Sequence, residues 1–210
     1  MKIILASASP RRKKLLTNIF PQFEVLTSDA PEKAIFTTPA EFVCELARQK
    51  AEHVIEKLKT DSRVQQTVSA NEEIVIISAD TIVFQDEEVL GKPATEEDAF
   101  RMLRSISGKT HEVYTGVSVF IFSDIRKSAL RSASFAESTK VSVAEITDCE
   151  IMTYISSREP FDKAGAYGIQ GQFSKFIRGI EGDYFNVVGL PVCRLYEHLK
   201  KLGVPCTDEI

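Results

Sequence analysis

The sequence has few of the side chains that bind zinc or form a disulfide framework. Its 4 cysteines contain no C-x-x-C pair, and its 3 histidines show neither H-x-x-H nor H-E-x-x-H spacing. These residues are Cys44, Cys149, Cys193, Cys206, His53, His111 and His198. Such scatter argues against a zinc hydrolase and against a disulfide-linked secreted domain. It predicts reduced thiols in a cytoplasmic protein.

The chain also lacks an excess of positive charge and any long apolar run. Its formal net charge is −4, whereas broad binding of nucleic acid or of an acidic membrane needs a basic surface. No apolar run approaches the ~20 residues that span a bilayer. The apolar stretch 3–6 is too short for the core of a signal peptide, and charged residues follow it at once. We therefore expect no nucleic-acid partner and no membrane, and a polyanion would need a local cluster of cations.

Two common catalytic motifs are missing. Without G-x-x-x-x-G-K-[ST] the chain is not a P-loop NTPase, and without G-x-S-x-G it lacks the usual serine-hydrolase elbow. Its hydrophobic content of 43% and charged content of 27% are ordinary for a globular protein. A length of 210 residues fits a single domain over 1–210, built as two intimately packed lobes.

The N-terminal segment Ser7-Ala-Ser-Pro-Arg-Arg12 has two readings. The run 3–6 predicts a buried strand and 11–18 an amphipathic helix, with Ser9 as its N-cap and Pro10 at its first position. A strand that turns directly into a helix points backbone N–H groups outward, and two hydroxyls with two guanidiniums would suit phosphate oxygens. The alternative is an ordinary capped helix with solvated arginines.

The remaining pattern predicts a mixed α/β fold. We expect strands at 23–27, 74–78, 82–84, 110–122 and 134–143, helices at 40–59, 95–105, 148–156 and 191–202, and a hairpin-like unit at 173–184. The polar stretch 60–73 predicts an exposed loop. Because strands and helices do not alternate strictly, the prediction is a mixed twisted sheet with flanking helices and not a doubly wound sheet.

Several polar residues lie where chemistry could occur. Asp80, with Thr81 beside it, follows the buried run 74–78, and α/β sheets open their ligand crevices at the carboxyl ends of strands. A turn-capping aspartate is the alternative. Lys50 falls on the buried side of its helix, where a snorkelling lysine is common. Lys92, between Gly91 and Pro93, reads either as an exposed turn lysine or as a charge on a stiffened turn.

The glycine-rich stretch 162–171 is the last candidate. It has too many glycines for a helix and too few apolar residues for a strand, so its backbone could approach a ligand closely. An irregular surface loop is the alternative.

Taken together, these segments resemble the Maf family of nucleoside triphosphate pyrophosphatases. The matching stretches are 5–12, 46–51, 78–83, 91–93, 107–111, 159–171, 180–184 and 188–191. Each is weak alone, but their order and spacing are highly specific. The resemblance implies hydrolysis of a nucleoside triphosphate to the monophosphate and pyrophosphate. It also implies an elongated α/β fold, two-lobed with a central cleft and related to the inosine triphosphatase architecture.

The resemblance also implies roles for individual residues. Asp80 would be the general base and a metal ligand, and Glu32 would serve the metal or the water. The triphosphate would be held by a set of cations, with Ser7 beside them as a further substrate-binding group. These cations are Arg11, Arg12, Lys50, Lys92 and Lys163. The implied cofactor is a divalent cation, Mg²⁺ or Mn²⁺, and a homodimer is expected because the family often dimerises.

Substrate choice is implied at Arg11, Thr81 and Gln170. The stretch 167–171 resembles the subgroup that acts on dTTP and UTP, and the Gln170 amide can pair with the O4 and N3–H edge of a pyrimidine. Two alternatives stay open. One is a pyrophosphatase for 7-methyl-GTP, and the other is a non-enzymatic regulator of cell division and septum formation.

Overall fold

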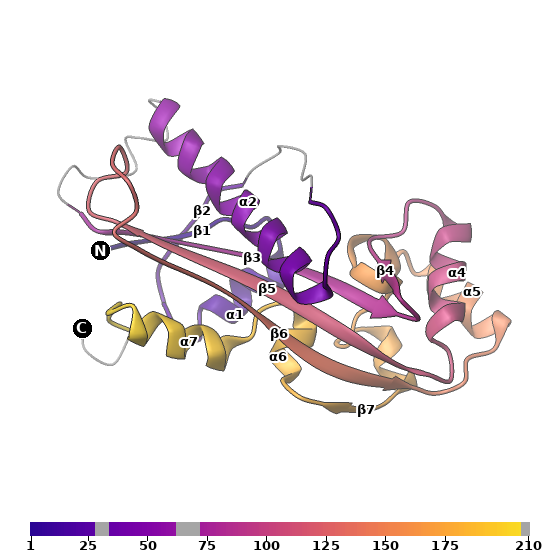
Figure 1. Ribbon diagram of the computed structural model, residues 1–210. Coiled ribbons are helices and arrows are strands. Elements are labelled where there is room, and N and C mark those ends of the chain that lie inside the picture. The colour runs from indigo at the N-terminus through magenta and orange to yellow at the C-terminus, as the bar shows by residue number, and fades with distance from the viewer. Residues whose placement is uncertain (28–33, 62–71, 207–210) are drawn as a thin grey trace.

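A mixed seven-stranded sheet forms the centre of the protein, for which a computed structural model describes residues 1–27, 34–61 and 72–206 (Figure 1). The strands are β1 (Lys2–Leu5), β2 (Glu24–Val25), β3 (Ile74–Gln85), β4 (Glu88–Leu90), β5 (Thr110–Phe122), β6 (Arg131–Val143) and β7 (Ile177–Glu181). The α-helices are α1 (Pro10–Leu16), α2 (Pro39–Thr60), α4 (Glu96–Ile106), α5 (Asp148–Ser156), α6 (Tyr184–Val188) and α7 (Val192–Lys201). Three 3₁₀ helices connect α5 to β7, namely η1 (Glu159–Asp162), η2 (Ala164–Ala166) and η3 (Gln172–Phe176).

The strand order confirms the predicted mixed sheet. It runs β2-β1-β3-β5-β6-β7, with β4 paired to β3. β1 is parallel to both of its neighbours, and the other pairs are antiparallel. Parallel strands need a long connection, and the stretch from β1 to β3 contains α1, β2 and α2.

One edge of β3 is shared by two short strands. Because β5 occupies the other edge along Ile74–Phe84, β1 and β4 must both lie on the remaining one. β1 pairs with 74–77 and β4 with 83–85, so residues 78–82 have no strand beside them on this edge among the described residues. The sheet is therefore open in the middle of β3.

The predicted end of a strand before Asp80 is wrong. β3 continues through Asp80, which pairs with Gly116 of β5, and the strand ends only at Gln85. The polar stretch 78–81 interrupts the apolar pattern without a turn because β5 supplies ladder partners throughout. Asp80 thus lies at the open edge of a continuous strand and not at a strand terminus.

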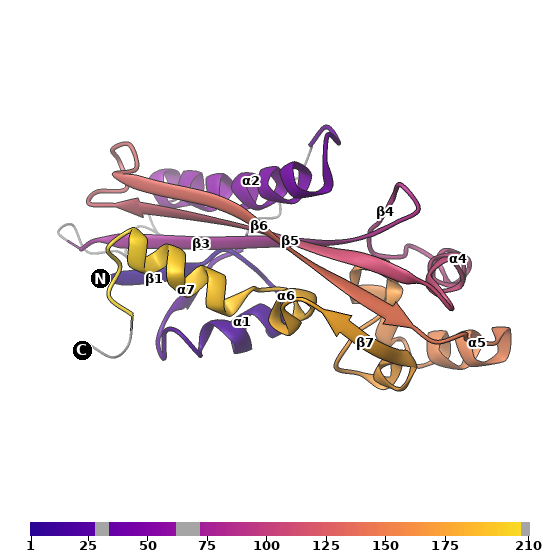
Figure 2. The same ribbon diagram turned by 60° about the horizontal axis from the view of Figure 1, so that its bottom comes forward.

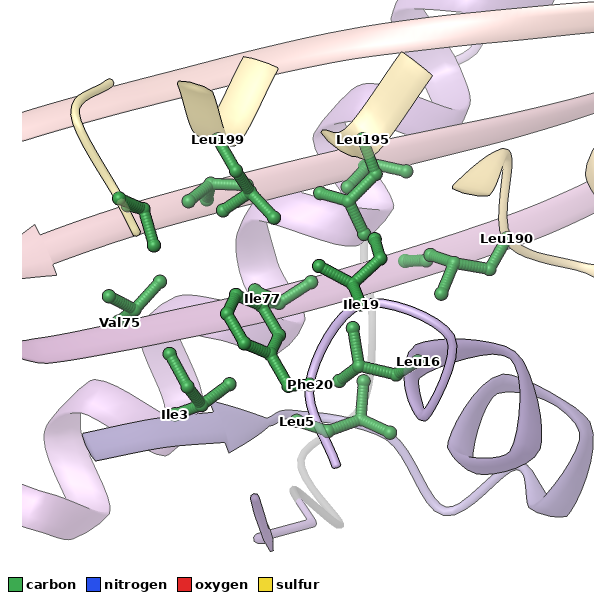
Figure 3. Packing of buried hydrophobic residues seen from close by; sticks show 14 of the residues in the cluster. Ile3, Leu5, Leu16, Ile19, Phe20, Val75, Ile77, Leu190, Leu195 and Leu199 are labelled. Atoms are coloured by element: carbon green, nitrogen blue, oxygen red, sulfur yellow. The ribbon is translucent and has the colours of Figure 1, made fainter. Parts of the chain in front are cut away.

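Helices cover both faces of the long strands (Figure 2). On one face α2 buries an apolar stripe at helical spacing, made of Val43, Leu46, Ala47, Ala51, Val54 and Leu58. On the other face α1 and α7 pack against β1 and β3, as the cluster around Leu16, Leu195 and Ile77 shows (Figure 3). A third buried cluster joins α4 and α5 to the far ends of β3, β5 and β6.

The predicted hairpin at 173–184 is also wrong. This stretch forms the end of η3, then β7, and then enters α6. β7 pairs with β6, where Val141 faces Ile180, so its partner is distant in sequence. Glu32 and most of the predicted loop 60–73 lie outside the described residues. No helix in the described ranges is long and apolar enough to cross a membrane.

One buried titratable group stands out in the third cluster. His111 of β5 is 2% exposed, and its Nε2 is 2.7 Å from the hydroxyl of Tyr167. Its Nδ1 is buried and makes no hydrogen bond within the described residues. Burial lowers the pKa of His111 from 6.5 to about 4, because the charged imidazolium loses its hydration.

We therefore expect the free energy of unfolding to fall on acidification between pH 6.5 and about 4. In this window the unfolded chain binds a proton at His111 that the folded chain does not, so protonation favours unfolding. The full loss would be about 3 kcal/mol. Urea titrations at several pH values measure it, and His111→Gln, which cannot titrate, should flatten this part of the profile. An equal slope in both proteins would contradict the assignment.

Candidate active site

A cleft of about 850 Å³ opens at the unpaired edge of β3. Buried members of all three apolar clusters line it, including Ala6, Val188 and Tyr167. Nine residues singled out from the sequence lie around this one cleft: Ser7, Arg11, Arg12, Lys50, Asp80, Thr81, Lys92, Lys163 and Gln170. They come from five separate stretches of chain.

Arg12 is held rigidly on the α1 side of the sheet. Ser9 caps α1 by accepting from the backbone N–H of Arg12, and Pro10 occupies the first turn, as predicted. The guanidinium donates from Nε to the Gly189 carbonyl at 2.8 Å and from Nη2 to the Thr81 hydroxyl at 2.9 Å. Nη1 lies 3.4 Å from the Ser7 hydroxyl. Gly189 has φ of +125°, a conformation that favours glycine and turns its carbonyl toward Arg12.

A chain of hydrogen bonds with defined donors and acceptors orients the hydroxyl of Thr81. The Thr115 hydroxyl donates to the carbonyl of Asn186 at 3.0 Å, so it accepts from the Thr81 hydroxyl at 2.9 Å. Thr81 in turn accepts from Arg12. Thr115 and Asn186 are fully buried, so the orientation of the Thr81 hydroxyl is fixed by groups that water does not reach.

Asp80 lies on the opposite face of β3, toward α2. Successive side chains of a strand point to opposite faces, so Asp80 and Thr81 approach the cleft from two sides. The ammonium of Lys50 forms an ion pair with Oδ1 of Asp80, and the two side chains are 20% and 14% exposed. Within the described residues, Oδ2 of Asp80 makes no hydrogen bond. Lys50 is therefore directed at a carboxylate in the cleft, not at bulk solvent.

Asp162 bridges two of the predicted phosphate-binding cations. Arg11 donates to its Oδ2 at 2.8 Å, and Lys163 donates to its Oδ1 at 2.6 Å and to the Glu159 carbonyl at 2.7 Å. Partial burial raises the pKa of Asp162, but hydrogen bonds from Lys163 and Arg11 outweigh it and hold this pKa below the usual value. The contact connects α1 to η1 across the cleft.

Lys92 and Gln170 are exposed at the cleft wall. Neither forms a hydrogen bond or ion pair with the part of the chain that the structure describes. The Gly165 N–H donates to the carbonyl of Gly91 at 2.9 Å, which ties the turn before Lys92 to the glycine-rich loop. Both side chains are thus carried by anchored backbone while their polar ends stay accessible.

The electrostatic character of the cleft differs from that of the whole chain. Five cationic side chains line it, against the two carboxylates of Asp80 and Asp162, whereas the chain carries a net charge of −4. This is the local cation cluster that a polyanion would require. The sequence alone gave no role to Thr115, Gly189 or Asp162, and each acts through a contact with a residue far away in the chain.

The described residues fit a divalent cation only if a substrate shares it. They contain no group of three or more histidine, cysteine, aspartate or glutamate side chains placed to hold a metal. Mg²⁺ is commonly held by one or two carboxylates together with substrate phosphates and water, and the Asp80 carboxylate can supply one such oxygen. Glu32, the other predicted ligand, lies outside the described residues.

The sequence of the chain matches a known family along nearly its whole length. The family described as "Maf-like protein" matches residues 2–202, and the chain belongs to it. A dTTP/UTP pyrophosphatase of Agathobacter rectalis is 50% identical over 97% of this chain and 98% of its own. A protein of the same name from Carboxydothermus hydrogenoformans is 49% identical, covering 97% and 100%. Among solved structures, a HAM1 protein from Coxiella burnetii aligns over 96% of this chain and 99% of its own, with 11% identity and a TM-score of 0.47.

Proposed function

We propose that this protein hydrolyses nucleoside triphosphates to the monophosphate and pyrophosphate, with dTTP and UTP as its preferred substrates. The observation that carries the proposal is a single cleft that is lined by five cations and contains the carboxylate of Asp80, which pairs with Lys50. The names of relatives at 43–50% identity over nearly the whole chain support the same reaction and substrates.

In the proposed reaction Asp80 activates a water molecule. Lys50 holds Oδ1, so Oδ2 is the oxygen that would take the proton as the water attacks the α-phosphorus. A bond forms between the water oxygen and the α-phosphorus, and the bond from that phosphorus to the bridging oxygen breaks. Pyrophosphate leaves with the electron pair of that bond, and its developing charge lies among Arg12, Lys92 and the other cleft cations.

We include a divalent cation in the proposal, Mg²⁺ or Mn²⁺, with Asp80 and Glu32 as its protein ligands. When bound, such a cation polarises phosphoryl oxygens and lowers the pKa of a coordinated water. The role of the chain is then to hold Asp80 at the open edge of β3, which the Lys50 ion pair and the β5 ladder do.

The base is selected, in this proposal, on the side of the cleft that the glycine-rich stretch 162–171 forms. The Gln170 amide has both a donor and an acceptor, which matches the O4 and N3–H edge of thymine and uracil. Arg11, fixed by Asp162, and Thr81, fixed by Thr115, are the other two proposed selectivity residues. Four expectations stay predictions: the two-lobed single domain over 1–210, the homodimer, the cytoplasmic location and the lack of a nucleic-acid partner.

Release of pyrophosphate from a panel of triphosphates with Mg²⁺ or Mn²⁺ tests the proposal. We expect turnover of dTTP and UTP to exceed that of purine triphosphates, as the names of the relatives at 43–50% identity indicate. Faster turnover of 7-methyl-GTP than of dTTP and UTP would identify 7-methyl-GTP as the preferred substrate instead. Orthophosphate in place of pyrophosphate would rule out attack at the α-phosphorus.

A further inference from the structure

Gln170 lies between two backbone amides that are anchored by the same pair of side chains. The N–H of Gly168 donates to the hydroxyl of Tyr154 at 3.3 Å. The N–H of Gln172 donates to Oε2 of Glu159 at 3.0 Å. One anchor therefore lies two residues before Gln170 and the other two residues after it, while the Gln170 side chain itself is exposed at the cleft.

The two anchors are joined to each other. The Tyr154 hydroxyl donates to Oε1 of Glu159 at 3.0 Å, so the chain of bonds runs from Gly168 through Tyr154 and Glu159 to Gln172. Tyr154 is 3% exposed, and its ring packs against Phe173 with centroids 5.2 Å apart. Burial, the largest cause, raises the pKa of Tyr154, so its hydroxyl keeps its proton and remains a donor to the carboxylate.

The fit of the loop around Glu159 is tight. A Cβ added at Gly171 would lie 1.9 Å from Oε1 of Glu159, so the backbone beside Gln170 rests directly on this carboxylate. The carbonyl of Glu159 also accepts from Lys163 at 2.7 Å. Glu159 thus fixes the loop backbone and one predicted phosphate-binding cation together, without itself lining the cleft.

We propose that Tyr154 and Glu159 are positioning residues for base selection, which act on the nucleotide through Gln170. This inference rests on the proposed function, because it assigns a cause to the discrimination between pyrimidine and purine triphosphates. An amide that reads a base edge must be held within a fraction of an ångström, and exposed side chains owe such placement to their backbone. The Tyr154–Glu159 pair holds that backbone on both sides of Gln170.

The test is Tyr154→Phe, which removes one oxygen and both of its hydrogen bonds while keeping the ring in the core. We measure kcat and KM for UTP and ATP and the binding of both nucleotides, because adenine has an amino donor where uracil has the O4 acceptor, whereas guanine repeats the acceptor of uracil. The expected result is a fall of roughly tenfold in the preference for UTP over ATP, mainly through a higher KM for UTP. In a protein that also carries Gln170→Ala, Tyr154→Phe should leave the nucleotide preference unchanged, because the side chain through which Tyr154 acts on the base is absent.

Tyr114→Phe is the matched control. The Tyr114 hydroxyl also bonds a carboxylate, Oε2 of Glu112, at 3.1 Å, but Tyr114 does not line the cleft. It should leave the UTP to ATP ratio unchanged. If Tyr154→Phe does not fold, Glu159→Gln is the second variant, since its amide oxygen can still accept from Tyr154 while the acceptor for Gln172 is lost.

The outcomes separate the two proposals. An equal loss of preference with and without Gln170 would overturn the positioning role, and so would an unchanged ratio in Tyr154→Phe. A wild-type protein that releases pyrophosphate from no triphosphate would overturn the proposed function. The binding ratio of UTP to ATP in the same variants then still decides the positioning role.

Discussion

Replacing Asp80 with asparagine should lower the release of pyrophosphate from UTP by about three orders of magnitude. The amide has nearly the shape of the carboxylate, but it cannot take a proton from the attacking water. The Oδ1 position can still accept from Lys50, so that lysine should stay directed into the cleft. The loss should therefore appear in kcat, and nucleotide binding measured without a divalent cation should change little.

The stability of Asp80→Asn distinguishes a chemical loss from unfolding. The ion pair with Lys50 is only partly buried, and its hydrogen bond can be kept, so we expect a change in the free energy of unfolding of about 1 kcal/mol. For a protein of this size that corresponds to about 2–4 °C in Tm. Asp124→Asn is the matched control, because Asp124 pairs with Arg126 away from the cleft. It should keep full activity.

Two results would contradict the role of Asp80. One is activity above a tenth of the wild-type value in a folded Asp80→Asn protein. The other is an effect on cell division that persists in that variant, which would favour a regulator that binds nucleotide without hydrolysing it. Loss of both pyrophosphate release and any such effect supports an enzymatic role.

Local sequence signals predicted most of the elements. Ser9 with Pro10 marked the start of α1. The long β-branched stretches predicted β5 and most of β6, and the helical period over 40–59 predicted α2. Each of these signals depends on neighbours within a few residues, which is the range over which caps and periodicity act.

The errors arose where a distant partner decides the structure. The polar residues 78–81 looked like the end of a strand, but the ladder with β5 carries β3 onward to Gln85. The segment 173–184 looked like a hairpin, but β7 pairs with β6. In both cases tertiary pairing outweighed the local pattern.

The candidate site shows the same difference between local signals and distant partners. The sequence identified which polar residues to suspect, and the family resemblance grouped them, but neither could show how each is held. Arg12 bonds a carbonyl 177 residues away, and Arg11 bonds a carboxylate 151 residues away. These partners carry no local signal. Asp162 lies in the candidate stretch 162–171 beside Lys163, but only the fold brings it to Arg11.

Gly116→Ala should destabilise the protein by about 3 kcal/mol, and it should also weaken catalysis. Gly116 is the β5 residue that pairs with Asp80, and side chains directly opposite each other in a sheet share a face. A Cβ there would lie 2.3 Å from the carbonyl carbon and oxygen of Val43 in α2. Because these atoms belong to a helix backbone, the clash can be relieved only by moving α2.

That movement would reach the candidate site. Lys50 lies two turns further along α2 from Val43, and its ammonium pairs with Asp80. The absent side chain at Gly116 thus lets the helix approach the sheet closely enough for this ion pair to form. We expect urea denaturation of Gly116→Ala to show the lost stability, and its pyrophosphate release to fall even at a temperature where it is fully folded.

Gly179→Ala in β7 is the matched control for backbone entropy. Among the described residues other than its chain neighbours, no atom lies within 4 Å of a Cβ added there, so this change should leave stability within about 1 kcal/mol and activity unchanged. If Gly116→Ala behaved like Gly179→Ala, the close approach of α2 would not be what holds Lys50 at Asp80. If Gly116→Ala lost stability but kept full activity, the prediction would also be wrong. Catalysis would then not depend on the exact position of Lys50 in α2.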